Sequence, residues 1–190
     1  MHEPVGQEKE KKTSVKKELL SWLRVLASSI LLALIITNFF IVNASVLTGS
    51  MENTIMTGDR VLGSRLSYIR NGPERYDVVI FRYPDSDENI NYVKRIIGLP
   101  GEKVQIIDGK VYIDDAEEPL YDGFTHEPPE GDHGPFYVPE DHYFLLGDNR
   151  NNSFDSKDWE THFVARDKIL GKMMFVYYPK LHWVDKAEAE

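Results

Sequence analysis

The 190-residue sequence contains no cysteine. A cysteine nucleophile and metal sites built on cysteine ligands are therefore excluded. Two common signatures are also missing, because the chain contains neither HExxH, which binds zinc, nor GxxxxGK[ST], which holds phosphates. Residues 85–89 begin like a calcium-binding loop, but Ile90 and Ile96 stand where that loop requires glycine and glutamate. We expect no metal ion and no cofactor.

Basic residues are scarce outside the N-terminus. The net charge at pH 7 is −9, and residues 1–24 hold six Lys and Arg against four Glu, which gives this segment +2 and the remainder −11. Affinity for nucleic acid depends on clustered basic charge. A body this acidic is not expected to bind DNA or RNA.

One long stretch has no charge at all. Val25–Val42 (VLASSILLALIITNFFIV) is eighteen residues long, and as a helix it would cover about 27 Å, close to the hydrocarbon thickness of a bilayer. Six Lys and Arg precede it and none follows before Arg60, so the positive-inside rule places the N-terminus in the cytoplasm. We expect residues 1–24 to be a cytoplasmic basic tail and residues 25–42 a single transmembrane anchor in the cytoplasmic membrane, with the rest of the chain outside.

A cleavable signal peptide is the alternative for this stretch. Val42-Asn43-Ala44 has small or modest residues where a cleavage site needs them. However, the apolar run is longer than the usual h-region, and the bulky Phe39 and Phe40 lie near its end. An uncleaved anchor is favoured.

Short β-branched or aromatic runs separated by Gly, Pro, Asn and Asp follow the anchor, without a helical period of useful length. The dipeptide Asp108-Gly109 indicates a two-residue hairpin. Residues 111–139 contain five prolines with several Gly and acids, which indicates a loop-rich insertion. We predict a mainly β fold, in which an extracytoplasmic antiparallel β-sheet domain is built from residues 43–110 and 140–190 around that insertion. The predicted strands lie in DRVLGSRL, YDVVIFRYP, NYVKRIIGL, KVQIIDGKVYID, HYFLLGD and ILGKMMFVYYP.

The segment TGSMENTIM, Thr48 to Met56, places Ser50 between glycine and methionine shortly after the anchor. A serine hydroxyl is a poor nucleophile until a nearby base accepts its proton. The six histidines are scattered, and none stands in a recognisable triad motif. A lysine is therefore the better candidate for the base.

Lys94 lies in NYVKRIIG, where period-2 alternation puts it on the same strand face as Tyr92 and Ile96. An ammonium group in apolar surroundings loses solvation, its pKa falls, and the neutral amine can then act as a general base. The alternative is a structural lysine whose stem follows the sheet and whose amine reaches water. Alternation alone leaves both interpretations open.

Four segments, GSMENTI, RYDVVIFRYP, YVKRIIGLPGE and GDNRNNSFDSKDW, occur in the order of the motif boxes of type I signal peptidases. Over about residues 20–180, the chain resembles a bacterial member of that family with a single N-terminal span. The resemblance implies a Ser-Lys endopeptidase that removes signal peptides from exported preproteins at the outer face of the cytoplasmic membrane.

The same resemblance assigns roles to individual residues. It implies that Ser50 is the nucleophile, which forms an acyl-enzyme, and that Lys94 is the general base. The oxyanion hole would consist of the Ser50 backbone N–H and the Thr48 hydroxyl, while Ser153 would hydrogen-bond the lysine amine and orient it. Small substrate side chains would enter shallow apolar pockets. The candidate pocket residues are Val46, Met51, Ile55, Tyr92 and Val93, and the candidate structural supports are Asp148, Arg150 and Asp155.

The sequence departs from the family pattern at three positions. Asn53 replaces the usual proline, whose loss is expected to loosen the loop, while Lys157 replaces a frequent arginine and Glu160 a common glycine. A catalytically inactive, membrane-tethered β domain that binds secreted proteins is therefore an alternative function. A self-cleaving Ser-Lys repressor protease is a second alternative, but the chain has an anchor and no helix-turn-helix.

Overall fold

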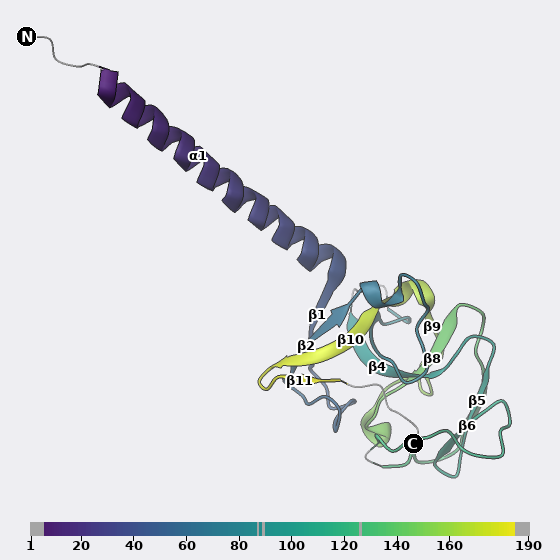
Figure 1. Cartoon of the computed structure of the whole chain (residues 1–190). Coiled ribbons are helices and arrows are strands. Elements are labelled where there is room, and N and C mark those ends of the chain that lie inside the picture. Colours follow the sequence, from purple (N-terminus) through teal and green to yellow (C-terminus); the bar gives the residue numbers. More distant parts are fainter. Residues whose placement is uncertain (1–5, 87, 89, 126, 185–190) are drawn as a thin grey trace, which may run out of the picture. The chain divides into compact units, whose positions relative to one another are not determined.

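The computed structural model describes residues 6–86, 88, 90–125 and 127–184, with side chains from residue 15 onward (Figure 1). The chain divides into two compact units, residues 1–40 and 41–190. Parts of four predicted segments lie outside the described residues: 1–5 of the basic tail, 87 and 89 of the acidic stretch, 126 of the insertion, and the C-terminal 185–190.

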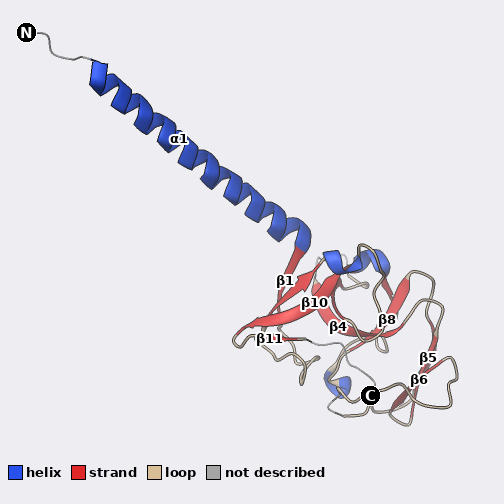
Figure 2. Cartoon of the chain, viewed as in Figure 1, coloured by secondary structure: helices blue, strands red, loops and turns tan. Residues whose placement is uncertain are grey.

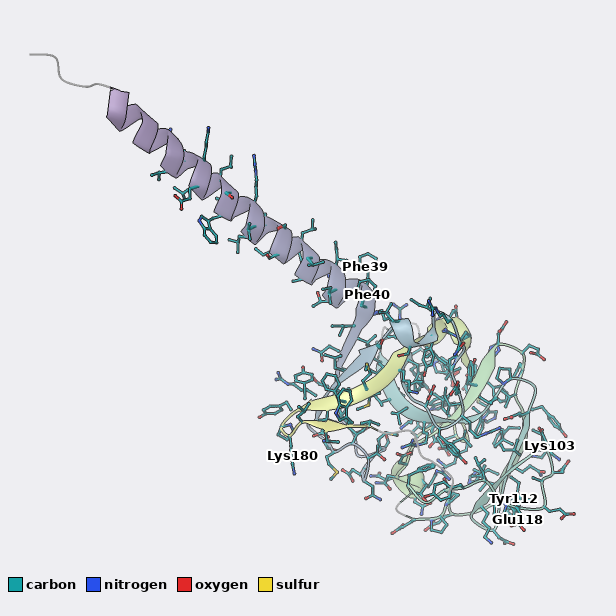
Figure 3. All side chains as sticks on the ribbon, viewed as in Figure 1. Phe39, Phe40, Lys103, Tyr112, Glu118 and Lys180 are labelled. Carbon is teal, nitrogen blue, oxygen red and sulfur yellow. The ribbon has the colours of Figure 1, made fainter. Side chains whose placement is uncertain are left out.

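The first unit is helical. α1 (Gly6–Ile35) continues into a short π-helical turn, η1 (Ile36–Phe40). The stretch Val15–Phe40 contains an 18-residue window with a mean hydropathy of 2.2 and is long and apolar enough to cross a bilayer. The rings of Phe39 and Phe40 at its end are exposed (Figure 3). By length and composition, this helix fits membrane anchoring.

Several polar side chains within this helix bond to its own backbone. Ser28, Ser29, Thr37 and Asn38 each donate to a carbonyl three or four residues earlier. Such bonds satisfy hydroxyl and amide groups that would otherwise lack partners in hydrocarbon. The polar residues of the predicted anchor are therefore compatible with a membrane span.

The end of the predicted anchor needs correction. Ile41 and Val42 do not continue the helix but open strand β1 (Ile41–Ser45), in which Val42 pairs with Gly63 and is only 4% exposed. In β1, the side chain of Val42 is buried in the core and its backbone is paired with β2. These two contributions favour the strand over continuation of the helix. Cleavage after Ala44 would remove β1, which disfavours the signal-peptide alternative.

The second unit is built on an eight-stranded sheet in the order β1-β2-β10-β3-β4-β8-β9, with β11 paired to β10 (Figures 1 and 2). Its pairings are antiparallel, so the predicted mainly β fold is confirmed. The predicted runs form strands, whereas β1, β9 and β11 were not predicted. The bounds are β2 Arg60–Ser64, β3 Val78–Arg82, β4 Asn91–Gly98, β8 His142–Leu146, β9 Val164–Ala165, β10 Ile169–Tyr178 and β11 His182–Trp183, with short 3-10 helices η2 Leu66–Tyr68, η3 Arg150–Asn152 and η4 Arg166–Lys168.

A smaller sheet, in the order β6-β5-β7, overlaps the predicted insertion of residues 111–139 but also takes in β5, which was assigned to the main β domain. It consists of β5 (Lys103–Ile107), β6 (Lys110–Ile113) and β7 (His133–Tyr137). Asp108 and Gly109 have φ of 49° and 71°, as a type I′ hairpin requires, which confirms the predicted turn. The predicted boundary at residue 111 falls inside β6, and β7 lies in the stretch expected to be loop. Pairing with β5 gives this proline-containing segment its strand conformation.

The two faces of the main sheet bury different clusters. Along β3, Val78 and Ile80 belong to one cluster and Val79 and Phe81 to another. A third cluster joins β8 to the smaller sheet. Because side chains alternate along a strand, neighbouring residues of β4 also point to opposite faces. This alternation determines which side chains surround Lys94.

Candidate active site

Ser50 lies in a tight turn that follows β1. The Thr54 and Ile55 N–H groups both donate to the Met51 carbonyl, at 3.0 and 2.8 Å. Met51 and Ile55 are buried in the core and anchor the turn. Ser50 itself is only 6% exposed. The candidate nucleophile is thus held by packing on its C-terminal side.

Asn53 occupies the third position of this turn with φ of 85°. Asparagine tolerates this left-handed conformation, whereas the proline ring fixes φ near −65°. Proline could therefore not adopt the conformation that Asn53 has in this turn. The expected loosening of the loop stays a prediction. The turn is closed by hydrogen bonds in a conformation that suits asparagine.

Lys94 lies in β4, and its side chain is buried with 3% exposure. Tyr92 and Ile96 on the same strand face belong to the surrounding apolar cluster. Burial lowers the pKa of Lys94 from 10.5 to about 8, and the charge of Asp155 partly opposes this shift. The alternative in which the amine reaches water along the sheet does not apply.

Ser50 and Lys94 meet in one cleft of about 560 Å³. The cleft is lined by residues 45–51, 90–94, 151–154 and 158. Among the described residues, the Ser50 hydroxyl has one hydrogen-bond partner, the Thr48 hydroxyl at 3.4 Å, and no hydrogen bond joins Ser50 to Lys94. Catalytic hydrogen bonds in unliganded enzymes are often long and shorten when substrate binds. The cleft therefore brings together the predicted nucleophile, base and oxyanion hydroxyl.

Ser153 also lines this cleft, but its predicted hydrogen bond to the lysine amine is not formed. Its hydroxyl is buried and has no partner among the described residues. It lies against Gly147, where an added Cβ would collide with both the Ser153 hydroxyl and the Ser50 carbonyl oxygen. Gly147 is thus needed for close approach of two backbone segments, a requirement that the sequence analysis missed.

An ion pair connects the lysine strand to the turn that follows β8. Arg95 donates to both Asp148 carboxylate oxygens, at 2.8 and 2.7 Å, and both side chains are almost fully buried. The Thr54 hydroxyl donates to the same carboxylate. A bidentate pair of this kind fixes orientation as well as distance. Asp148 therefore links Arg95, next to Lys94, to the turn that carries Ser50.

Arg150 and Asp155 are likewise buried and paired. The Arg150 guanidinium forms an ion pair with Asp122 and donates to the Gly147 carbonyl at 3.1 Å. The Asp155 carboxylate accepts from the Gly147 N–H at 3.0 Å and pairs with Lys157 at 3.2 Å. These contacts match the structural role that was predicted for both residues.

Four of the five predicted pocket residues line the cleft, together with further residues that were not predicted. Val46, Met51, Tyr92 and Val93 line the cleft as predicted. Ile55 does not, because its fully buried side chain packs in the core cluster beneath Met51. The additional lining side chains include Leu47, Ile90, Phe154 and Asp158. In the described part of the chain, no group of three His, Cys, Asp or Glu is placed to hold a metal ion.

The comparisons with known proteins all lead to the same family. The model of the family described as "Signal peptidase, peptidase S26" matches residues 19–178. The chain is similar to a probable signal peptidase I-2 from Synechocystis sp., with 36% identity over 179 residues that cover 89% of this chain and 80% of the relative. A signal peptidase I S from Bacillus subtilis is 35% identical, with coverage of 90% and 95%. A signal peptidase I from Leptolyngbya laminosa is 33% identical, with coverage of 93% and 88%.

Proposed function

The chain belongs to the peptidase S26 family of signal peptidases, serine endopeptidases that remove signal peptides from exported preproteins, and we propose that Ser50 is its nucleophile and Lys94 its general base. One observation carries this assignment. A buried serine hydroxyl and a buried lysine amine with a pKa of about 8 line the same cleft. A lysine with that pKa is partly neutral near neutral pH and can accept a proton.

The reaction would proceed through an acyl-enzyme. Lys94 takes the proton from the Ser50 hydroxyl as its oxygen attacks the scissile carbonyl carbon. The resulting oxyanion is stabilised by the Ser50 N–H and the Thr48 hydroxyl. The C–N bond then breaks, and Lys94 returns its proton to the leaving amine of the mature protein. In the second half-reaction, Lys94 takes a proton from water as the water oxygen attacks the ester carbon. The C–O bond to Ser50 then breaks, Lys94 returns its proton to the Ser50 oxygen, and the signal peptide leaves with a free carboxylate.

Strand pairing supports binding of the preprotein in extended form. β4 pairs with β3 along residues 91–95, whereas β8 pairs with β4 only from Arg95 onward. In the part of the chain that the structure describes, no strand pairs with the opposite edge of residues 91–94, which line the cleft together with residues 45–51. A substrate segment can add there as a strand. Its alternate side chains would then lie near Val46, Met51 and Val93.

The finer localisation is also a proposal. The N-terminal helix fits a membrane anchor, and the six Lys and Arg of residues 1–24 favour an N-terminus in the cytoplasm. The catalytic unit would then lie on the outer side of the cytoplasmic membrane. Preproteins present their signal peptides at that surface, where the anchor would hold the enzyme.

The test is cleavage of a purified preprotein by full-length enzyme in detergent. Ser50→Ala and Lys94→Ala should each abolish cleavage while retaining the circular dichroism spectrum of the wild type. Matched controls are Ser67→Ala and Lys110→Ala, two exposed positions outside the cleft, which should cleave normally. Full cleavage by either active-site variant would disprove the assignment of that residue.

A further inference from the structure

We propose that Asn149 is a positioning residue for the oxyanion hole and that it sets the direction of the Ser50 N–H. This inference rests on the proposed function. Two contacts carry it. The Asn149 side-chain amide donates to the Gly49 carbonyl at 3.1 Å, and its backbone N–H donates to the Ser50 carbonyl, also at 3.1 Å. One residue thus holds two consecutive carbonyls of the nucleophile turn, and the Glu52 N–H also donates to the Gly49 carbonyl, at 3.1 Å, from within that turn.

Because the peptide bond is planar, the contact between Asn149 and the Gly49 carbonyl also sets the direction of the Ser50 N–H. In a trans peptide, the carbonyl of Gly49 and the N–H of Ser50 point in opposite directions. Gly49 and Ser50 line the cleft, whereas Asn149 is not among the lining residues. Asn149 therefore holds the carbonyl on the side away from the cleft, so that the Ser50 N–H points toward the substrate.

Within the described part of the chain, the Ser50 N–H donates to no acceptor, whereas the flanking carbonyls of Gly49 and Ser50 are both occupied. A donor that is fixed in direction and not yet engaged is what a developing oxyanion requires, because no reorganisation is then needed during the reaction. The Asn149 amide supplies this fixation from outside the nucleophile turn.

Asn149 is itself held on both sides. The preceding residue, Asp148, forms the buried ion pair with Arg95, and the Asn149 carbonyl accepts from the Asn152 N–H at 3.1 Å. The side-chain amide is thus presented from a turn that is tied to the lysine strand. Rotation of the Gly49–Ser50 peptide would break the bond to this amide.

The experiment compares Asn149→Ala and Asn149→Asp with wild type in full-length, detergent-solubilised enzyme at pH 9.5, where Lys94 is neutral. The aspartate variant keeps the size of the side chain but places an acceptor against the Gly49 carbonyl. Removal of one oxyanion donor costs about 10²–10³ in kcat. We therefore expect kcat to fall on the order of tenfold to a hundredfold when this donor is misdirected, with KM within about twofold of wild type.

Two inhibitors separate positioning from general structural damage. A substrate-derived peptide aldehyde adds to Ser50: its carbonyl carbon bonds to the serine oxygen, Lys94 accepts the serine proton, and the aldehyde oxygen becomes an oxyanion. The matching peptide alcohol cannot form this adduct. Affinity for the aldehyde should fall by the same factor as kcat in both variants, while affinity for the alcohol stays unchanged. Asn71→Asp, in an exposed loop, should behave like wild type in both assays.

The outcomes are distinct. Wild-type kcat in both Asn149 variants would overturn the proposal, as would a parallel loss of affinity for aldehyde and alcohol, because the residue would then support the fold rather than the N–H. Wild-type enzyme and Ser50→Ala are assayed alongside. Cleavage by Ser50→Ala would refute the proposed function, and that result is independent of what the Asn149 variants do.

Discussion

Raising the pH from 6 to 10 should increase kcat/KM for preprotein cleavage until Lys94 is neutral, with a midpoint near pH 8. Burial lowers the pKa of this lysine from 10.5 to about 8. At pH 7, about one amine in ten is then neutral, compared with roughly one in 3,000 for a solvated lysine. Burial thus increases the concentration of active base about 300-fold at that pH.

Two neighbouring charges allow the assignment to be tested in opposite directions. The carboxylate of Asp158 raises the pKa of Lys94, and the ammonium of Lys157 lowers it. Asp158→Asn should therefore move the acid limb of the profile to lower pH, and Lys157→Gln should move it to higher pH. The assay is kcat/KM against pH, because this parameter reports ionisation of the free enzyme. Lys110→Gln, which removes an exposed charge, serves as the control.

The same burial predicts an effect on stability. The difference between 10.5 and 8 is 2.5 pKa units, and at 1.36 kcal/mol per unit this corresponds to roughly 3 kcal/mol. Below pH 8, Lys94 is charged in both the folded and the unfolded protein, and the folded protein carries the full free-energy cost of burying that charge. This cost declines as pH rises from 8 and has disappeared above 10.5, where the lysine is neutral in both states. Lys94→Met should accordingly be inactive but more stable than wild type at pH 7, and the gain should vanish near pH 11.

Three results would refute this reasoning. A wild-type midpoint above pH 10 would show that the amine is solvated. If Asp158→Asn and Lys157→Gln moved the acid limb of the kcat/KM profile in the same direction, that limb would reflect the ionisation of a group other than Lys94. Equal stability of Lys94→Met and wild type at pH 7, measured by urea unfolding, would show that the buried amine carries no penalty.

Other substitutions test separate parts of the site. Thr48→Ala should lower kcat about 10²–10³-fold and Thr48→Ser should be nearly harmless, since only the former removes the proposed oxyanion hydroxyl; wild-type turnover of Thr48→Ala would exclude that role. Asn53→Gly should retain activity and Asn53→Pro should lose stability, because φ of 85° suits glycine and not proline; equal melting temperatures would contradict this account. Arg95→Met should cost about 3–5 kcal/mol in urea unfolding, because it leaves the Asp148 carboxylate buried and unpaired, and a change below 1 kcal/mol would show that the pair is not needed.

Local patterns in the sequence were sufficient for much of the fold. β-Branched and aromatic runs in YDVVIFRYP and NYVKRIIGL predicted β3 and β4, and Asp108-Gly109 predicted the hairpin, because strand and turn conformations depend on residues close in the chain. The uncharged run likewise predicted a helix able to span a bilayer. The order of four motifs was enough to identify the family.

Contacts between distant segments could not be predicted in this way. Apolar residues suit lipid and core equally, so only the pairing of β1 with β2 decided that Ile41 and Val42 leave the helix. Alternation placed Lys94 on a face, but the elements covering that face decided that its amine is kept from water and that its pKa falls.

The same limit applies to the support of the nucleophile. Nothing in GDNRNNSFDSKDW indicates that Asn149 binds the carbonyls of Gly49 and Ser50, a hundred residues earlier in the chain. The sequence by itself determined the strands, the anchor and the residues able to carry the chemistry, because these depend on local composition. Only the tertiary structure decided which of them are buried, paired and directed at the cleft, because burial and orientation depend on what packs against each group.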